Sequence, residues 1–190
     1  HLGHMMKIIN LPLSGALEIY NSKLEDQRGW FSRYYCKKEL GECGIHQDIM
    51  QINCSFTKLR GSVRGLHLQH TPHEEDKLVR CLVGKIYDVI LDVRLDSPTY
   101  GCWHSVVLEA DKMNMLFIPK GFAHGFQTLE PNCQVLYLHT EFYAPNAEGG
   151  YRYDSPELNI SWPLKITEVS ARDKALDLFL PDKSLKYDEV

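Results

Sequence analysis

Two eleven-residue stretches of strict alternation limit the folds open to this chain. In "KIYDVILDVRL" (85–95), apolar side chains share one face with Tyr87, and three of the four on the other face are charged. In "CQVLYLHTEFY" (133–143), one face carries Tyr137, His139, Glu141 and Tyr143, and the other carries Leu136, Leu138 and Phe142. Successive side chains of a strand point to opposite sides, so a period of two predicts strands.

Turn signals recur at short spacing along the rest of the chain. They lie at 60–62, 83–85, 96–98, 119–121 and 130–132, and each contains Gly, Pro, Asn or Asp. Many short strands joined by regular turns are typical of a sandwich or barrel. One helical segment is expected near the end, from Ser170 to Leu178, with Ser170 as a candidate N-cap. The 190 residues fit one domain.

Composition narrows the class of protein. The net charge of −4 argues against a general nucleic-acid binder, and no apolar run approaches the roughly 20 residues of a membrane helix. The six cysteines include no CxxC pair and are expected to be reduced thiols of a cytoplasmic protein. Residues 1–5 resemble a tag remnant, so the domain is expected to span 6–190.

The polar faces of the strands have two interpretations. They can be ordinary solvated faces, or they can line a wet pocket inside a barrel. Tyr137, His139 and Tyr143 are unusual on a plain solvent face and suit a pocket wall. The stretch "RGLHLQH" (64–70) is also too polar for a strand that only fills a core.

The stretch "FIPKGFAHGF" (117–126) contains Pro-x-Gly-x-x-His, which resembles the second motif of the cupins, a superfamily of double-sheet jelly rolls. In metal-binding cupins this histidine, here His124, is a ligand together with a His-x-His pair and a Glu. His67 and His70 are three residues apart in a strand and face opposite sides, so no metal is expected. A metal-dependent oxygenase using His67, His70 and His124 remains an alternative.

A set of motifs occurs in one order along nearly the whole chain and resembles the nucleotide-sugar 3,5-epimerase family. The set is "DQRGWF" (26–31), "QINCS" (51–55), "RGLH" (64–67), "KLVRCLVGKIYDVILDVR" (77–94), "SPTYGCW" (97–103), "IPKGFAHGF" (118–126), "LYLHTEFYAP" (136–145) and "DSPELNISWP" (154–163). The resemblance implies an all-β, cupin-type double-sheet jelly-roll barrel with a short C-terminal helical segment. It also implies catalysis without a cofactor, and a homodimer in which the DxRG segment crosses to the neighbouring subunit.

The resemblance implies roles for eleven residues. His67 would be the base, Tyr137 the acid on the opposite side of the sugar, and Lys77 the cation that stabilises the enolate. Asp173, in "SARD", would orient His67. The remaining positions would bind substrate: Asp88, His124 and Tyr143 in the pocket, and Arg28, Gln51, Asn53 and Arg64 at the nucleotide.

Two of these assignments conflict with simpler interpretations. Strict alternation places Arg64 and His67 on opposite faces, so both can serve one site only if the strand bulges or if they contact different parts of the ligand. The Ser-x-x-Asp pattern of Ser170 and Asp173 can equally be the N-terminal chemistry of a helix.

The resemblance implies an epimerase that inverts C3, C5 or both of a nucleotide-diphospho-4-keto-6-deoxyhexose, or of a related 4-keto-heptose, in deoxysugar and polysaccharide precursor synthesis. Departures from the family pattern at Leu68, Glu75, His139 and Phe142 leave the nucleotide, dTDP or GDP, and the sugar open. The alternatives are a sugar-nucleotide 3,4-ketoisomerase and a non-catalytic sugar-nucleotide binding module.

Overall fold

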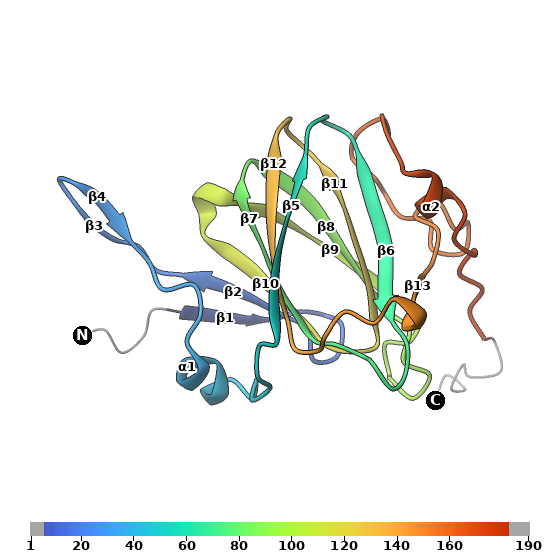
Figure 1. The fold of residues 1–190 in the computed structure, drawn as a ribbon, viewed down its shortest axis with the longest axis horizontal. Helices are drawn as coiled ribbons and strands as arrows, with labels where there is room; N and C mark the ends of the chain where they lie inside the picture. The colour runs from blue at the N-terminus through green and yellow to red at the C-terminus, as the bar shows by residue number, and fades with distance from the viewer. Residues whose placement is uncertain (1–5, 183–190) are drawn as a thin grey trace.

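A computed structural model describes residues 6–182, which form two antiparallel sheets facing one another (Figure 1). The six-stranded sheet has the order β1-β2-β10-β7-β12-β5, with β1 Met6–Asn10, β2 Leu17–Asn21, β10 Asn114–Ile118, β7 Lys77–Val83, β12 Cys133–His139 and β5 Gln51–Thr57. The five-stranded sheet has the order β13-β6-β11-β8-β9, with β13 Glu148–Gly150, β6 Val63–Gln69, β11 Phe122–Thr128, β8 Lys85–Asp92 and β9 Trp103–Glu109. The expected double-sheet jelly roll is confirmed.

Short elements complete the described chain. They are the hairpin β3 Leu24–Asp26 and β4 Gly29–Phe31, the helices α1 Lys37–Glu42 and α2 Ala171–Lys174, and the 3-10 turns η1 Ala110–Lys112 and η2 Pro145–Ala147. The hairpin projects away from the two sheets (Figure 1). None of the helices within residues 6–182 has the length and apolar character needed to cross a bilayer. The expected tag remnant, 1–5, lies outside the described residues.

The C-terminal helix is shorter than the sequence predicted. Ser170 is its N-cap, as expected, and its hydroxyl accepts a hydrogen bond from the Asp173 backbone N–H at 3.1 Å. The helix ends at Lys174 because the next residues pair with another segment: the Arg152 N–H donates to the Asp177 carbonyl at 2.9 Å. Phe179 is then buried against the five-stranded sheet.

Both faces of β8 are covered, which the alternating pattern did not reveal. Ile86 and Ile90 belong to the core between the two sheets. Val89 and Leu91, on the opposite face, pack under the C-terminal segment together with Leu158 and others. The polar side of the pattern is therefore not a solvated face. Asp88 and Asp92 lie on it, and both are fully buried.

Candidate active site

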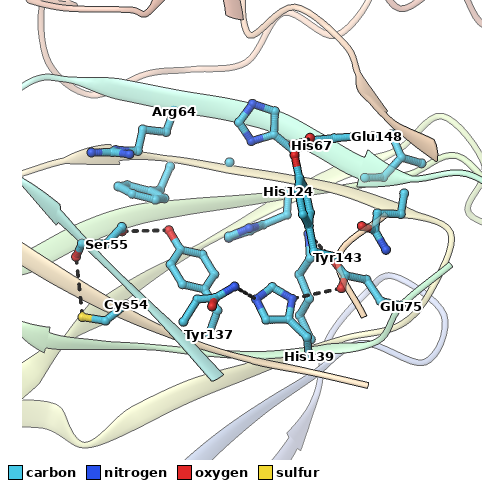
Figure 2. A pocket seen from close by; sticks show the side chains of 16 residues that line it. Cys54, Ser55, Arg64, His67, Glu75, His124, Tyr137, His139, Tyr143 and Glu148 are labelled. Carbon is cyan, nitrogen blue, oxygen red and sulfur yellow. Dashed lines mark hydrogen bonds and ion pairs between the residues drawn. The ribbon is translucent and has the colours of Figure 1, made fainter. Parts of the chain in front are cut away.

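A cavity of about 280 Å³ opens between the two sheets (Figure 2). Seven of the predicted site residues line it: Asn53, Arg64, His67, Lys77, His124, Tyr137 and Tyr143. Its other walls come from Cys54, Ser55, Leu68, Gln69, Glu75, Gly125, Phe126, His139 and Glu148. Residues more than 80 positions apart in the sequence thus form one polar pocket, as expected if the strand faces line a ligand site.

His67 is held by a buried carboxylate. Its Nε2 lies 2.6 Å from Asp173 Oδ1, and the Gly65 backbone N–H donates to Asp173 Oδ2 at 2.9 Å. Burial alone would raise the pKa of Asp173, but the hydrogen bonds from His67 and Gly65 outweigh it, so that pKa lies below its usual range. An ionised Asp173 accepts the Nε2–H of a neutral imidazole, which leaves the lone pair on Nδ1. His67 is therefore equipped to take a proton.

A bulge between β6 and β11 resolves the conflict over Arg64 and His67. The pairing shifts register there: His124 faces His67, whereas Phe126 faces Arg64. Gly65 has a φ of +114°, and a Cβ on it would lie 2.6 Å from the Cα of Gly125. Only two glycines allow the strands to approach this closely. The bulge lets both Arg64 and His67 line the cavity, one of the two possibilities that the sequence left open.

Tyr137 lies across the cavity from His67 (Figure 2). Its hydroxyl is 3.0 Å from the Ser55 hydroxyl on the neighbouring strand β5. Burial raises the pKa of Tyr137 to about 12, so the phenol is protonated at neutral pH. The ring makes an edge contact with the His124 ring and stacks on the His139 ring at 6.0 Å between centroids. A fixed, protonated phenol thus faces the imidazole.

His124 has its own carboxylate partner behind the pocket wall. Its Nε2 lies 2.7 Å from Asp88 Oδ2. Burial raises the pKa of Asp88 even though His124 and Lys77 act in the opposite direction. Within residues 6–182, Asp88 Oδ1 has no hydrogen-bond partner. Asp88 thus supports His124 and does not reach the cavity itself.

Lys77 is part of a charged row in the same wall. Its ammonium lies 3.3 Å from Glu75 Oε1, and Glu75 Oε2 lies 2.9 Å from His139 Nδ1. His139 Nε2 is in turn 3.2 Å from Asn53 Nδ2. Burial raises the pKa of Glu75, but His139 and Lys77 outweigh this effect, and the net shift is downward.

Four predicted residues do not line the cavity. Asp88 and Asp173 lie behind His124 and His67, and Gln51 uses its side-chain oxygen to accept the Tyr143 backbone N–H at 2.9 Å. Arg28 lies on the projecting hairpin, where it pairs with Asp26, and not in this pocket. His70, which the oxygenase alternative requires, is absent from the cavity wall. Among residues 6–182, no group of three or more His, Cys, Asp or Glu side chains is arranged to hold a metal ion.

Sequence reasoning missed several residues around the site. Ser55 and Glu148 line the cavity, as does Glu75, which the sequence marked only as a departure from the family pattern. A second cavity of about 560 Å³ shares Arg64 and His67 with the first and adds Lys58 and Arg172. Arg172 also pairs with Glu148, which accepts the Tyr143 hydroxyl at 2.8 Å. For Arg172, the available signal was its position beside Asp173 in "SARD".

The fold and the site together define a class of protein: a double-sheet β-barrel whose cavity presents a carboxylate-bound histidine and a buried phenol. The sequence model of the dTDP-4-dehydrorhamnose 3,5-epimerase family matches residues 10–180. A dTDP-4-dehydrorhamnose 3,5-epimerase of Salmonella typhimurium is 38% identical over 176 residues, covering 92% of this chain and 96% of that protein.

Solved structures agree with the sequence comparison. The Bacillus anthracis dTDP-4-dehydrorhamnose 3,5-epimerase with TDP and PPi bound has a TM-score of 0.90 at 38% identity and covers 92% of this chain and 99% of its own. The Legionella pneumophila dTDP-6-deoxy-D-glucose-3,5-epimerase in complex with dTDP-4-keto-L-rhamnose has a TM-score of 0.88 at 37% identity and covers 95% and 96%. The chain belongs to the dTDP-4-dehydrorhamnose 3,5-epimerase family and is an isomerase of the carbohydrate epimerase class.

Proposed function

We propose that this protein epimerises C3, C5 or both of a nucleotide-diphospho-4-keto-6-deoxyhexose or a related 4-keto-heptose, dTDP- or GDP-linked. The observation that carries the proposal is the placement of His67 and Tyr137 on opposite sides of one cavity (Figure 2). Inversion at carbon requires removal of a proton from one face and delivery of a proton to the other. A base and an acid that face each other meet that requirement.

The chemistry follows from the 4-keto group, which acidifies the C–H bonds at C3 and C5. His67 Nδ1 takes the proton from C3 or C5. The electron pair of the broken C–H bond forms a double bond to C4, and the negative charge of the resulting enolate lies on the C4 oxygen. Lys77 supplies a positive charge for that oxygen. Tyr137 then donates its proton to the carbon from the opposite side. Asp173 stabilises the imidazolium that forms on His67.

The nucleotide is expected to extend toward the second cavity. Arg64 belongs to both cavities, and Arg172 and Lys58 add positive charge to the second. Guanidinium groups suit a diphosphate because each presents two donors to two oxygens. Asn53 offers a polar contact at the edge of the first cavity.

A homodimer that exchanges the N-terminal hairpin accounts for two features of the single chain, namely the exposed aromatic residues of the hairpin and an apolar hollow on the six-stranded sheet. The hairpin exposes Trp30 and Phe31 and carries Arg28 away from the pocket of its own chain (Figure 1). Ile52 lies with Leu136 and Leu138 along an apolar hollow of the six-stranded sheet. A second copy would cover this surface and could bring Arg28 to the partner's site. The six free thiols support a reducing, cytoplasmic location.

The test is turnover in deuterated water against a panel of dTDP-, GDP- and UDP-linked 4-keto sugars, with NMR to identify the exchanging carbon. An epimerase incorporates deuterium at C3, C5 or both and inverts the labelled carbon. Absence of incorporation across the panel would refute the proposal. Movement of the carbonyl to C3 would instead identify a 3,4-ketoisomerase.

Tyr137→Phe separates the two proton transfers. Because the phenol supplies the second proton, the variant should lose inversion by about 10²-fold or more and retain exchange of the first proton. The measurement is the ratio of deuterium wash-in to product formation. Equal loss of both steps would contradict the role of Tyr137 as the acid.

A further inference from the structure

The row Lys77–Glu75–His139 is a group of polar cavity residues that the proposed reaction explains only in part. Lys77 has a role at the enolate, but the reaction does not require Glu75 or His139. An anionic substrate would in fact be repelled by a carboxylate in the cavity wall. Glu75 nevertheless lines that wall, and only 9% of its side chain is exposed. A buried carboxylate with the same sign of charge as the substrate calls for a structural explanation.

The contacts of Glu75 indicate that explanation. Each of its oxygens has a different partner: Oε1 lies 3.3 Å from the Lys77 ammonium, and Oε2 lies 2.9 Å from His139 Nδ1. A lysine ammonium is a point charge on a flexible four-carbon stem, so its position is set by what holds it. Lys77 itself lines the cavity, so the contact with Glu75 sets where the ammonium lies along the cavity wall.

His139 is fixed on three sides. Its Nδ1–H donates to Glu75, its Nε2 is 3.2 Å from Asn53, and its ring stacks on Tyr137 with 13° between the planes. Because Nδ1 carries the hydrogen bonded to Glu75, Nε2 of the neutral ring accepts from the Asn53 amide. These contacts hold the imidazole, and the imidazole holds the second oxygen of Glu75 (Figure 2).

We propose that Glu75 and His139 are a positioning pair that keeps the Lys77 ammonium at the enolate site. The catalytic consequence rests on the proposed epimerase function, whereas the placement of Lys77 does not. Neither residue needs to touch the substrate for this role. Small displacements of a catalytic group can lower a rate by about 10²-fold, so such a pair is worth retaining despite its unfavourable charge.

The first test measures Lys77 directly and requires no substrate. Acylation by an amine-directed reagent is followed by mass spectrometry of the peptide that contains Lys77, with the exposed Lys112 as the internal reference. Glu75→Gln and His139→Gln should each raise the labelling rate of Lys77 relative to Lys112 at least fivefold, because the ammonium loses its anchor. An unchanged ratio in both variants would overturn the proposal.

The second test is kinetic and separates positioning from loss of fold. Glu75→Gln should lower kcat about tenfold to a hundredfold. KM should stay the same or fall, because a negative charge leaves the wall of a cavity that receives an anionic substrate. A structural role alone would raise KM and lower the unfolding temperature together. The matched control is Glu141→Gln, the same change two residues beyond His139 and outside the cavity wall, which should alter neither constant.

A pair of conservative variants tests His139. Asparagine places an amide nitrogen near the position of Nδ1, whereas glutamine places one near Nε2. His139→Asn should therefore recover most of the kcat that His139→Gln loses. Equal loss in both would overturn the role of His139, and faster labelling of Lys77 without any fall in kcat would overturn the catalytic role of the pair. If the wild-type protein exchanges no substrate, the proposed function fails, and the labelling ratio still decides the placement of Lys77.

Discussion

The site contains two histidine–carboxylate pairs of nearly equal length that differ in their surroundings. His67 Nε2 lies 2.6 Å from Asp173 Oδ1, and His124 Nε2 lies 2.7 Å from Asp88 Oδ2. The side chain of His67 is 32% exposed, toward the cavity, whereas that of His124 is 4% exposed. Asp173 accepts a second hydrogen bond from the Gly65 backbone, whereas the free oxygen of Asp88 has none within residues 6–182.

These surroundings move the two carboxyl pKa values in opposite directions. The pKa of Asp173 is lowered because the hydrogen bonds to its charged form outweigh burial, and the pKa of Asp88 is raised because burial dominates. The same two residue types thus give a cavity-facing imidazole with an ionised partner in one place and a buried imidazole beside a disfavoured carboxylate in the other. Environment, and not residue identity, distinguishes the two pairs, and it is the reason why the proposed function assigns the base to His67.

The largest expected effect distinguishes the two histidines. His67→Asn should lower deuterium exchange about 10⁴-fold because it removes the proton acceptor. His124→Asn should cost only about tenfold to a hundredfold, since that ring shapes the wall beside Tyr137. Exchange into a 4-keto sugar nucleotide is the measurement. Comparable losses in the two variants would remove the distinction between the pairs.

Substitution of the two carboxylates should follow the same order as substitution of the two histidines: the change at Asp173 should lower kcat more than the change at Asp88. Asp173→Asn keeps the shape but removes the charge that stabilises the His67 imidazolium, and kcat should fall about 10³-fold. Asp88→Asn should change kcat less than about tenfold, because a neutral amide oxygen can still accept from His124. Steady-state kinetics at pH 7.5 decides. A larger loss for Asp88→Asn would reverse the assignment.

Asp173 and Asp88 should make contributions of opposite sign to the pH dependence of the free energy of unfolding. The lowered pKa of Asp173 means that its ionised form stabilises the fold above the unfolded pKa of about 3.9, and that this stability is lost as pH falls through the lower folded pKa. Asp173→Asn should therefore cost about 1–3 kcal/mol at pH 7, with the difference closing in acid.

Asp88 should behave in the reverse way. Its raised pKa means that the ionised form is disfavoured in the folded state, so the wild-type protein gains stability as pH falls through that raised pKa toward the unfolded value. At pH 7, Asp88→Asn should be as stable as the wild type or more stable. Urea unfolding from pH 7 to pH 3.5 measures the stability of each variant relative to the wild type. If both stability differences change with pH in the same direction, the comparison between Asp173 and Asp88 is wrong.

The smallest effect concerns how Asp173 is delivered to His67. Ser170→Ala removes the hydroxyl that caps the Asp173 backbone N–H and should cost about 1 kcal/mol of stability. Because the side chain of Asp173 keeps its bonds to Gly65 and His67, kcat should fall no more than about threefold. Ser170→Asp retains a cap and serves as the control. A loss in kcat near that of Asp173→Asn would show that the cap itself aligns the base.

Particular residues show how much the sequence could reveal. The alternation in 133–143 placed Tyr137 and His139 on one face, and their residue types suited a pocket wall better than a solvated face; both line the cavity. Ser170 was recognisable as a helix cap. The opposite-face problem of Arg64 and His67 was recognisable too, but the bulge that solves it depends on the meeting of Gly65 and Gly125, 60 positions apart in the chain. No local pattern encodes such a contact.

The sequence by itself determined the all-β fold, the family and seven of the sixteen residues that line the cavity, because strand periodicity and ordered motifs are local properties of the chain. Tertiary structure alone decided which histidine carries an ionised partner, where Lys77 is held, and that Asp173 is both the capped residue of a helix and the partner of His67. Those properties depend on burial and on contacts between distant strands. They exist only once the two sheets have packed face to face.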